Sequence, residues 1–206
     1  MSILITEQTV PVTPAANEVV QWPDMVLSSP FVKDAAGRAW GRSHRSSIAN
    51  QTGFASDTYV TGSGILVPSF GVQAQTMFEW IMSVSKTAAG VAAPVYQLRV
   101  GGLQTTADVS LMSMTGPAQT AVADVGVLTI LVTVRSVGAA GVFQAIAIWN
   151  HNAVITGFSV DDAGAIQGTS AGLNNSAFGG AFVGLSINGG ASAAWTMTQV
   201  RANAIW

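Results

Sequence analysis

The chain has 206 residues, of which 49% are hydrophobic and 9% are charged, and its formal net charge at pH 7 is −2. Soluble domains carry about 25% charged residues, so this chain has too few charges to coat a free surface and is expected to bury surface in an assembly. The small negative charge argues against broad electrostatic binding of nucleic acid, and the lack of cysteine excludes disulfides and thiolate metal sites.

The sequence shows no recognisable secretory signal or membrane-spanning segment. Residues 1–7 lack the basic start and long apolar core of a secretory signal. The longest uninterrupted apolar run, residues 145–149, is far shorter than the roughly 20 residues of a membrane-spanning helix. We therefore expect neither conventional secretion nor a membrane protein.

Residues 1–50 differ in composition from the rest of the chain. They hold four of the seven prolines, Pro11, Pro14, Pro23 and Pro30, and proline disfavours helix interiors and central strands. This composition predicts an extended N-terminal arm over residues 1–50, followed by a single domain over residues 51–206. Large apolar side chains are spaced along the arm, and they would dock either on another protein or back on the chain's own domain.

Residues 51–206 predict short strands separated by turns. Short candidates lie at residues 59–60 and 65–67, and longer ones at 77–84, 95–100, 109–114, 153–160, 165–169, 178–188 and 194–201. Most of the longer candidates alternate between apolar and polar residues, as half-buried strands do, and no ten-residue stretch has the apolar spacing of a helix. The pattern predicts an all-β fold, an antiparallel β-sandwich of jelly-roll type.

The clearest hairpin spans residues 127–149. Its first strand alternates cleanly, while its return strand, residues 142–149, is apolar at every position except Gln144. Such a strand needs cover on both faces, so we expect it at an inner sheet or at an interface between subunits.

Chemistry-bearing residues do not form a recognisable catalytic, cofactor or metal site. His44 lies in a basic patch of the arm, and His151 follows the return strand without a nucleophile elbow elsewhere, so His151 is interpreted as a polar loop cap. Asp161 and Asp162 precede Gly164 in a turn-like sequence with too few ligands for calcium. Asp108 and Asp124 are interpreted as loop residues.

Aromatic and branched residues provide the candidate contacts instead. Tryptophan rings can stack on sugars, but they more often anchor cores and interfaces. The predicted interface residues are Trp22, Phe31, Trp40, Ile146, Ile148, Trp149 and Trp206.

Four stretches, residues 63–69, 83–90, 134–142 and 185–196, resemble segments of structural proteins of tailed bacteriophages. The resemblance covers about residues 60–201 and rests on turn and strand sequences rather than on chemical signatures. It implies a trimeric β-sandwich module of the capsid-decoration, head-fibre or tail-fibre type, and it carries over no active site.

The sequence therefore predicts a non-enzymatic virion structural protein, assembled in the host bacterial cytoplasm. It would form a homotrimer through its β domain and attach through its arm to the major capsid protein or another virion protein, without cofactor, nucleic acid or membrane. One alternative is a receptor- or glycan-binding tail-fibre module that contacts host surface glycan. Another is a glycan-degrading enzyme, which would need two converging acids among Asp108, Asp124, Asp161 and Asp162.

Overall fold

A computed structural model describes residues 13, 16, 19–23, 30–34, 39–153, 156–159, 165–190 and 192–206. The described residues form strands, turns and loops without any helix, so the predicted all-β class is confirmed. It follows that no helix of the described part could cross a membrane.

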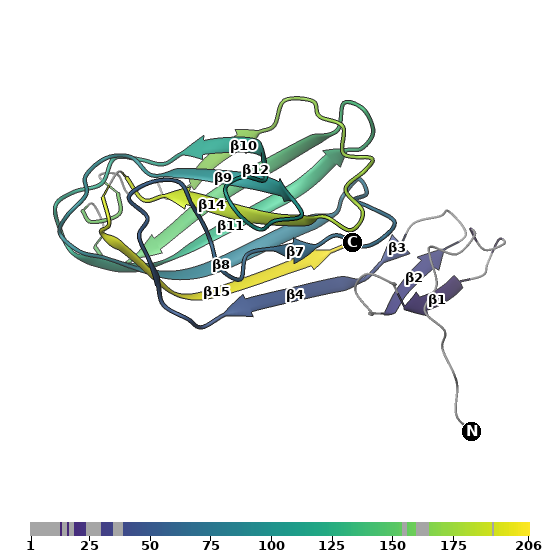
Figure 1. Cartoon of the computed structure of the whole chain (residues 1–206), viewed down its shortest axis with the longest axis horizontal. Helices are drawn as coiled ribbons and strands as arrows, with labels where there is room; N and C mark the ends of the chain where they lie inside the picture. The colour runs from purple at the N-terminus through teal and green to yellow at the C-terminus, as the bar shows by residue number, and fades with distance from the viewer. Residues whose placement is uncertain are drawn as a thin grey trace, which may run out of the picture.

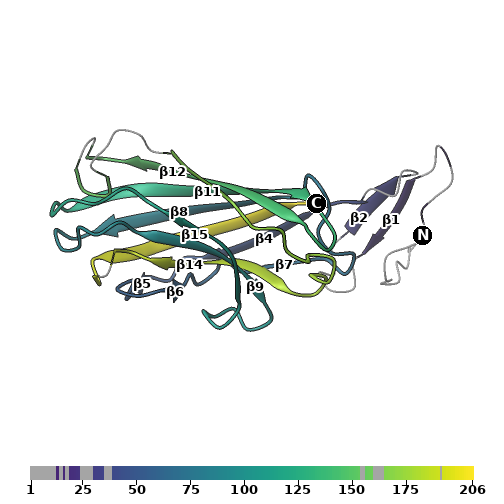
Figure 2. The same cartoon turned by 90° about the horizontal axis from the view of Figure 1, so that it is seen from above.

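The larger of two packed sheets has seven antiparallel strands (Figures 1 and 2). Its strand order is β13-β12-β11-β8-β15-β4, and β5 pairs with β15 beside β4. The bounds are β4 Arg42–Ser47, β5 Gln51–Thr52, β8 Met77–Lys86, β11 Asp124–Ser136, β12 Val142–His151, β13 Ala165–Thr169 and β15 Trp195–Ile205.

The smaller sheet has five strands in the order β10-β9-β14-β6, with β7 also paired to β14. Its strands are β6 Thr58–Tyr59, β7 Ile65–Leu66, β9 Val95–Gly101, β10 Val109–Thr115 and β14 Phe182–Asn188. The two sheets pack face to face, so the prediction of an antiparallel β-sandwich is confirmed.

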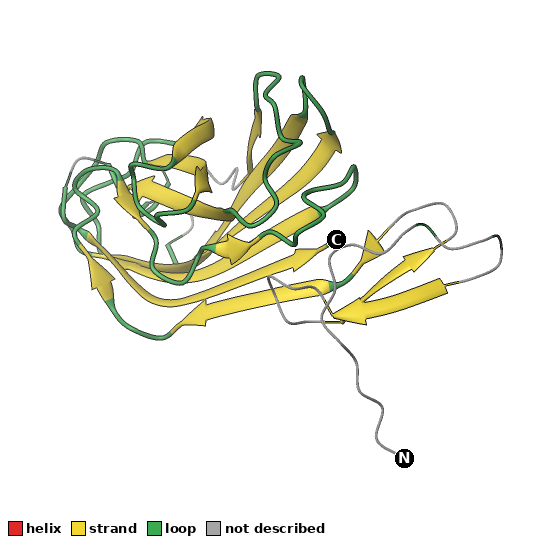
Figure 3. Cartoon of the chain, turned by 45° about the vertical axis from the view of Figure 1, so that its right-hand side comes forward, coloured by secondary structure: helices red, strands yellow, loops and turns green. Residues whose placement is uncertain are grey.

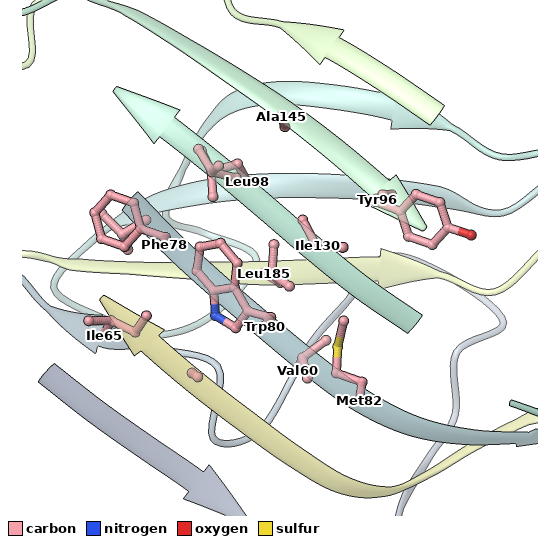
Figure 4. Packing of buried hydrophobic residues seen from close by; sticks show 14 of the residues in the cluster. Val60, Ile65, Phe78, Trp80, Met82, Tyr96, Leu98, Ile130, Ala145 and Leu185 are labelled. Atoms are coloured by element: carbon pink, nitrogen blue, oxygen red, sulfur yellow. The ribbon is translucent and has the colours of Figure 1, made fainter. Parts of the chain in front are cut away.

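The core lies between the sheets and is built by alternation along each strand. On β8, Phe78, Trp80 and Met82 are fully buried and face Tyr96 and other residues of the smaller sheet (Figure 4). Burying each large side chain of this kind stabilises the fold by about 1.5–3 kcal/mol. The buried indole groups remain hydrogen-bonded, as the N–H of Trp80 donates to the carbonyl of Ser63 at 2.7 Å.

A third sheet, of three strands, lies beyond the end of the sandwich at which the C-terminus emerges (Figures 1 and 3). It contains β1 Val19–Pro23, β2 Pro30–Asp34 and β3 Ala39–Trp40. Pro23 and Pro30 lie at strand ends and oppose each other in the register, where proline is tolerated. The described part of the predicted arm is thus paired rather than simply extended.

The predicted boundary at residue 50 falls inside the sandwich. β4 falls within the predicted arm, but it pairs with β15 along six residues and forms an edge of the larger sheet. Its sequence, RSHRSS, has no apolar alternation because its inward positions are polar: Ser43 accepts the Trp206 N–H, and Arg45 lies over the Phe182 ring. Charges on an edge strand also discourage pairing with other chains.

Most other predicted strands are confirmed, and one is wrong. The hairpin of residues 127–149 is present as β11 and β12, with a register shift between Val134 and Ser136. The strand predicted over residues 153–160 does not form in its described residues, which make bends and turns. There the Phe158 ring stacks on Trp149 at 4.4 Å, so the alternation reflected side-chain burial in a loop.

Candidate functional site

The outer face of the larger sheet carries an apolar area on β8, β11 and β12. On β12 the core takes Phe143, Ala145, Ala147 and Trp149, so Ile146 and Ile148 project from the opposite face. Ile148 keeps 36% of its surface exposed, and Ile146 is half-buried. The described residues therefore leave the outer face of the return strand uncovered, although its sequence predicts cover on both faces.

Strand register extends this area across the sheet. Leu131 of β11 lies opposite Ile146, and Thr129 lies between Ile148 and Ile81 of β8. A hollow of about 440 Å³ lies over these strands, lined by Met77, Leu131, Thr133, Arg135, Gln144, Ala145, Ile146 and Gln167. We call Ile81, Leu131, Ile146 and Ile148 the apolar half-face.

The other half of the same face is polar. His44, Asn203 and Glu79 are register partners on β4, β15 and β8. Asn203 links them, with its oxygen 2.8 Å from Nδ1 of His44 and its Nδ2 donating to Glu79 at 3.0 Å. The same row continues into Leu131 and Ile146 and ends at Gln167, so it is apolar only on β11 and β12.

Two of the predicted interface residues are buried in the chain's own core. Trp149 is 6% exposed, and its N–H donates to the Tyr96 hydroxyl at 2.8 Å. Trp206 is 4% exposed, and its N–H donates to the Ser43 hydroxyl at 3.0 Å. Trp149 also packs on Phe158 and Trp195, and Trp206 packs on Phe70 and Phe78, so both rings anchor the chain's own core.

The three predicted contacts of the arm have described backbones only. Trp22 of β1 lies opposite Phe31 of β2 in the register, and Trp40 of β3 lies opposite Val32. Their side chains lie outside the described residues, so their interface role remains a prediction.

Asp124 and His151 form a buried pair at one end of the larger sheet. Nδ1 of His151 lies 2.7 Å from Oδ2 of Asp124, and the two side chains are 8% and 1% exposed. The carboxylate also accepts the backbone N–H groups of Val125, Ala153 and Phe158. The pair thereby fastens the loop after β12, in agreement with the loop-cap interpretation of His151.

Lys86 lies beside this pair and is also buried. Its ammonium donates to the carbonyls of Thr87, Thr120 and Val122. Burial lowers the pKa of Lys86, and the nearby charge of Asp124 opposes that shift. These groups hold loop backbone, and Lys86 and Asp124 also line a shallow hollow of about 310 Å³ together with Val125 and Asn152.

A second buried charge cluster covers the outer face of the smaller sheet. The Arg99 guanidinium donates to the Ser186 hydroxyl at 2.6 Å and to the Asp108 carbonyl at 2.7 Å, and it pairs with the Asp57 carboxylate. Burial raises the pKa of neighbouring Tyr59 to about 12. The Asp108 carboxylate accepts backbone N–H groups of its own loop, so it acts as a loop residue, as predicted.

Aromatic platforms for sugars are not exposed in the described part of the chain. The buried aromatic side chains include Trp80, Trp149, Trp195, Trp206, Tyr96 and Phe158. Nor do the described residues bring three potential metal-ligating side chains together. Asp161 and Asp162 lie outside the described residues.

Sequence reasoning found part of this site and missed the rest. Ile146 and Ile148 were identified from the apolar return strand, and the alternation of β8 and β11 could have added Ile81 and Leu131. The Asp124–His151 pair spans 27 residues and the row from His44 to Asn203 spans 159, so neither has a local signal.

A scan against family models finds no match to this chain, and a search of curated proteins also finds none.

Proposed function

We propose that this protein is a non-enzymatic structural subunit of a bacteriophage virion, of the capsid-decoration or head-fibre type, that self-associates through the apolar half-face. The observation that carries the proposal is the apolar half-face on β8, β11 and β12, which no described residue covers, in a chain with 9% charged residues. Apolar surface without charges is typical of the centre of subunit interfaces. The trimer follows from the resemblance to phage proteins.

Strand pairing supports a jelly-roll assignment. The larger sheet contains the run β4-β15-β8-β11, and the smaller sheet contains β6 or β7 beside β14, followed by β9 and β10. Early strands thus pair with late strands in both sheets, which is the nested order of a jelly roll, with β12 and β13 added at one edge. Jelly rolls recur in viral capsid proteins, although fold-level analogy alone does not assign function.

Attachment to the particle is assigned to the N-terminal part of the chain. The sheet of β1, β2 and β3 lies beyond the end of the sandwich, where a major capsid protein or another virion protein could contact it. Removing residues 1–38 leaves β4 in place and should abolish attachment to particles while the sandwich stays folded. Electron microscopy of particles mixed with both forms would show whether decoration depends on this part.

Self-association is tested by one pair of neighbouring substitutions. Ile146→Asp puts a charge at the centre of the apolar half-face, and we expect a folded monomer by light scattering where the unaltered chain gives a trimer. Ala147→Asp, one residue along the same strand, places its charge in the core and should prevent folding instead. A trimer that persists with Ile146→Asp, or an unaltered chain that is monomeric, would refute the proposal.

The glycan-binding alternative has less support. It requires exposed rings, and the four tryptophans whose side chains the structure describes lie in the core. The enzymatic alternative requires two converging acids, whereas Asp108 and Asp124 each bind the backbone of separate loops.

A further inference from the structure

Charge is divided unevenly between the start of the chain and the sandwich. Residues 1–32 contain three acids, Glu7, Glu18 and Asp24, and no lysine or arginine. Among the side chains that the structure describes, by contrast, the exposed charged ones are all arginines, namely Arg42, Arg45, Arg135 and Arg201. Three acids of the sandwich are already engaged: Asp57 by Arg99, Asp124 by His151, and Asp108 by backbone N–H groups.

Two of these arginines flank a hollow on the polar half of the outer face. Arg42 of β4 and Arg201 of β15 line a space of about 320 Å³ together with His44, Glu79, Asn203 and Ile205. Glu79 is held by the Asn203 amide, and no ion pair joins Arg42 or Arg201 to a carboxylate within the described part of the chain. Ile205 is 47% exposed, so the hollow offers apolar surface beside two free positive charges.

We propose that residues 1–18 of the same chain dock in this hollow. The segment combines Glu7 and Glu18 with apolar residues, namely Ile3, Leu4, Ile5, Val10 and Val12, and has no base. Its charge and its apolar side chains therefore complement those of the hollow. An extended peptide of this composition satisfies both arginines and covers Ile205.

The register of the small N-terminal sheet shows that residues 1–18 are long enough to reach the hollow. Val20, Lys33 and Ala39 are successive register partners, so Val20 lies two strand spacings, about 10 Å, from Ala39. Arg42 follows three residues later, about 10 Å further along the chain. Eighteen extended residues span up to about 60 Å, far more than the separation requires.

Docking within one chain is also favoured because tethering raises the effective concentration of the segment at the hollow. A segment tethered this closely has an effective concentration in the millimolar range, so the ion pairs and apolar contacts need to contribute only about 4 kcal/mol together to hold it. The inference does not depend on the virion role, because the hollow and the segment belong to one chain.

Hydrogen–deuterium exchange of the full-length protein tests the proposal. We expect backbone amides of residues 1–18 to exchange slowly, and the double variant Arg42→Glu with Arg201→Glu to speed their exchange about tenfold. Arg45→Glu is the matched control, because Arg45 lies on the same strand but its guanidinium is 5.8 Å from the Phe182 ring of the other sheet. That control should leave the exchange of residues 1–18 unchanged.

Each contrary result has a clear meaning. Fast exchange in the unaltered chain, or protection that survives the double variant, would overturn the proposal. Equal loss in the Arg45→Glu control would show a general charge effect and would also overturn it. Protection that disappears on dilution or in Ile146→Asp would show docking on a neighbouring copy, against the assignment to the same chain. Unchanged exchange in β8 serves as the check that each variant is folded.

Discussion

Removing the Asp124 carboxylate should cost the protein a large part of its stability. Asp124→Ala strands four donors at once, which are three backbone N–H groups and the His151 ring nitrogen. The N–H of Phe158 is buried and loses its partner outright, at about 1–3 kcal/mol. The other three donors are partly buried and can partly rehydrate, so together they add roughly 2 kcal/mol.

The total loss, about 3–5 kcal/mol, compares with the 5–15 kcal/mol that stabilises a typical domain. Urea unfolding followed by tryptophan fluorescence should register it, because Trp149 and Trp195 both pack on Phe158. The midpoint should fall by more than about 1 M urea. Asp124→Asn keeps one acceptor and the side-chain volume, so it should lose roughly half as much.

This experiment separates a structural carboxylate from a catalytic one. A catalytic acid in a solvated cleft could be replaced with little loss of stability, or even with a gain. If Asp124→Ala lowered the free energy of unfolding by less than about 1 kcal/mol, the four hydrogen bonds would not hold the loop as we infer.

Three further outcomes are expected. The two tyrosines, Tyr59 and Tyr96, have pKa values raised by burial, to about 12 for Tyr59, so the folded protein should show no tyrosinate absorbance at pH 10. Because unfolded tyrosines ionise there and folded ones do not, stability should fall as the pH rises above about 10, and early titration of either residue would contradict its burial. Gly184→Ala would push a Cβ into the Tyr59 hydroxyl and should cost about 2 kcal/mol in a urea melt. Adding Tyr59→Phe should restore only part of that loss, because the ring Cζ would still lie 2.7 Å from the added Cβ. Gln73→Ala removes both hydrogen bonds to the backbone of Ala39, and it should speed amide exchange at Ala39 with little change in the global melt; a large global loss would show that β3 is part of the core.

Alternation along single strands was enough to predict much of the fold. Phe78, Trp80 and Met82 share a face because side chains two residues apart point the same way, and only one face of a half-buried strand can be dry. The same rule identified the return strand and placed Ile146 on the face opposite Ala147. The alternation rule failed at residues 153–160, where Phe158 is buried although it lies in a loop. Asp124 holds that loop by accepting the Phe158 N–H.

The sequence by itself thus determined the strand class, most of the strands and the apolar character of β12, because these depend on neighbours a few residues apart. Tertiary structure alone decided which surfaces stay open. β4 is recognisable only from its pairing with β15, and the polar row from His44 to Glu79 exists only because three distant strands align in register. Tryptophan is common at interfaces, but Trp149 and Trp206 are buried in the core. There the N–H of Trp149 donates to Tyr96 of the second sheet, and the N–H of Trp206 donates to the Ser43 hydroxyl.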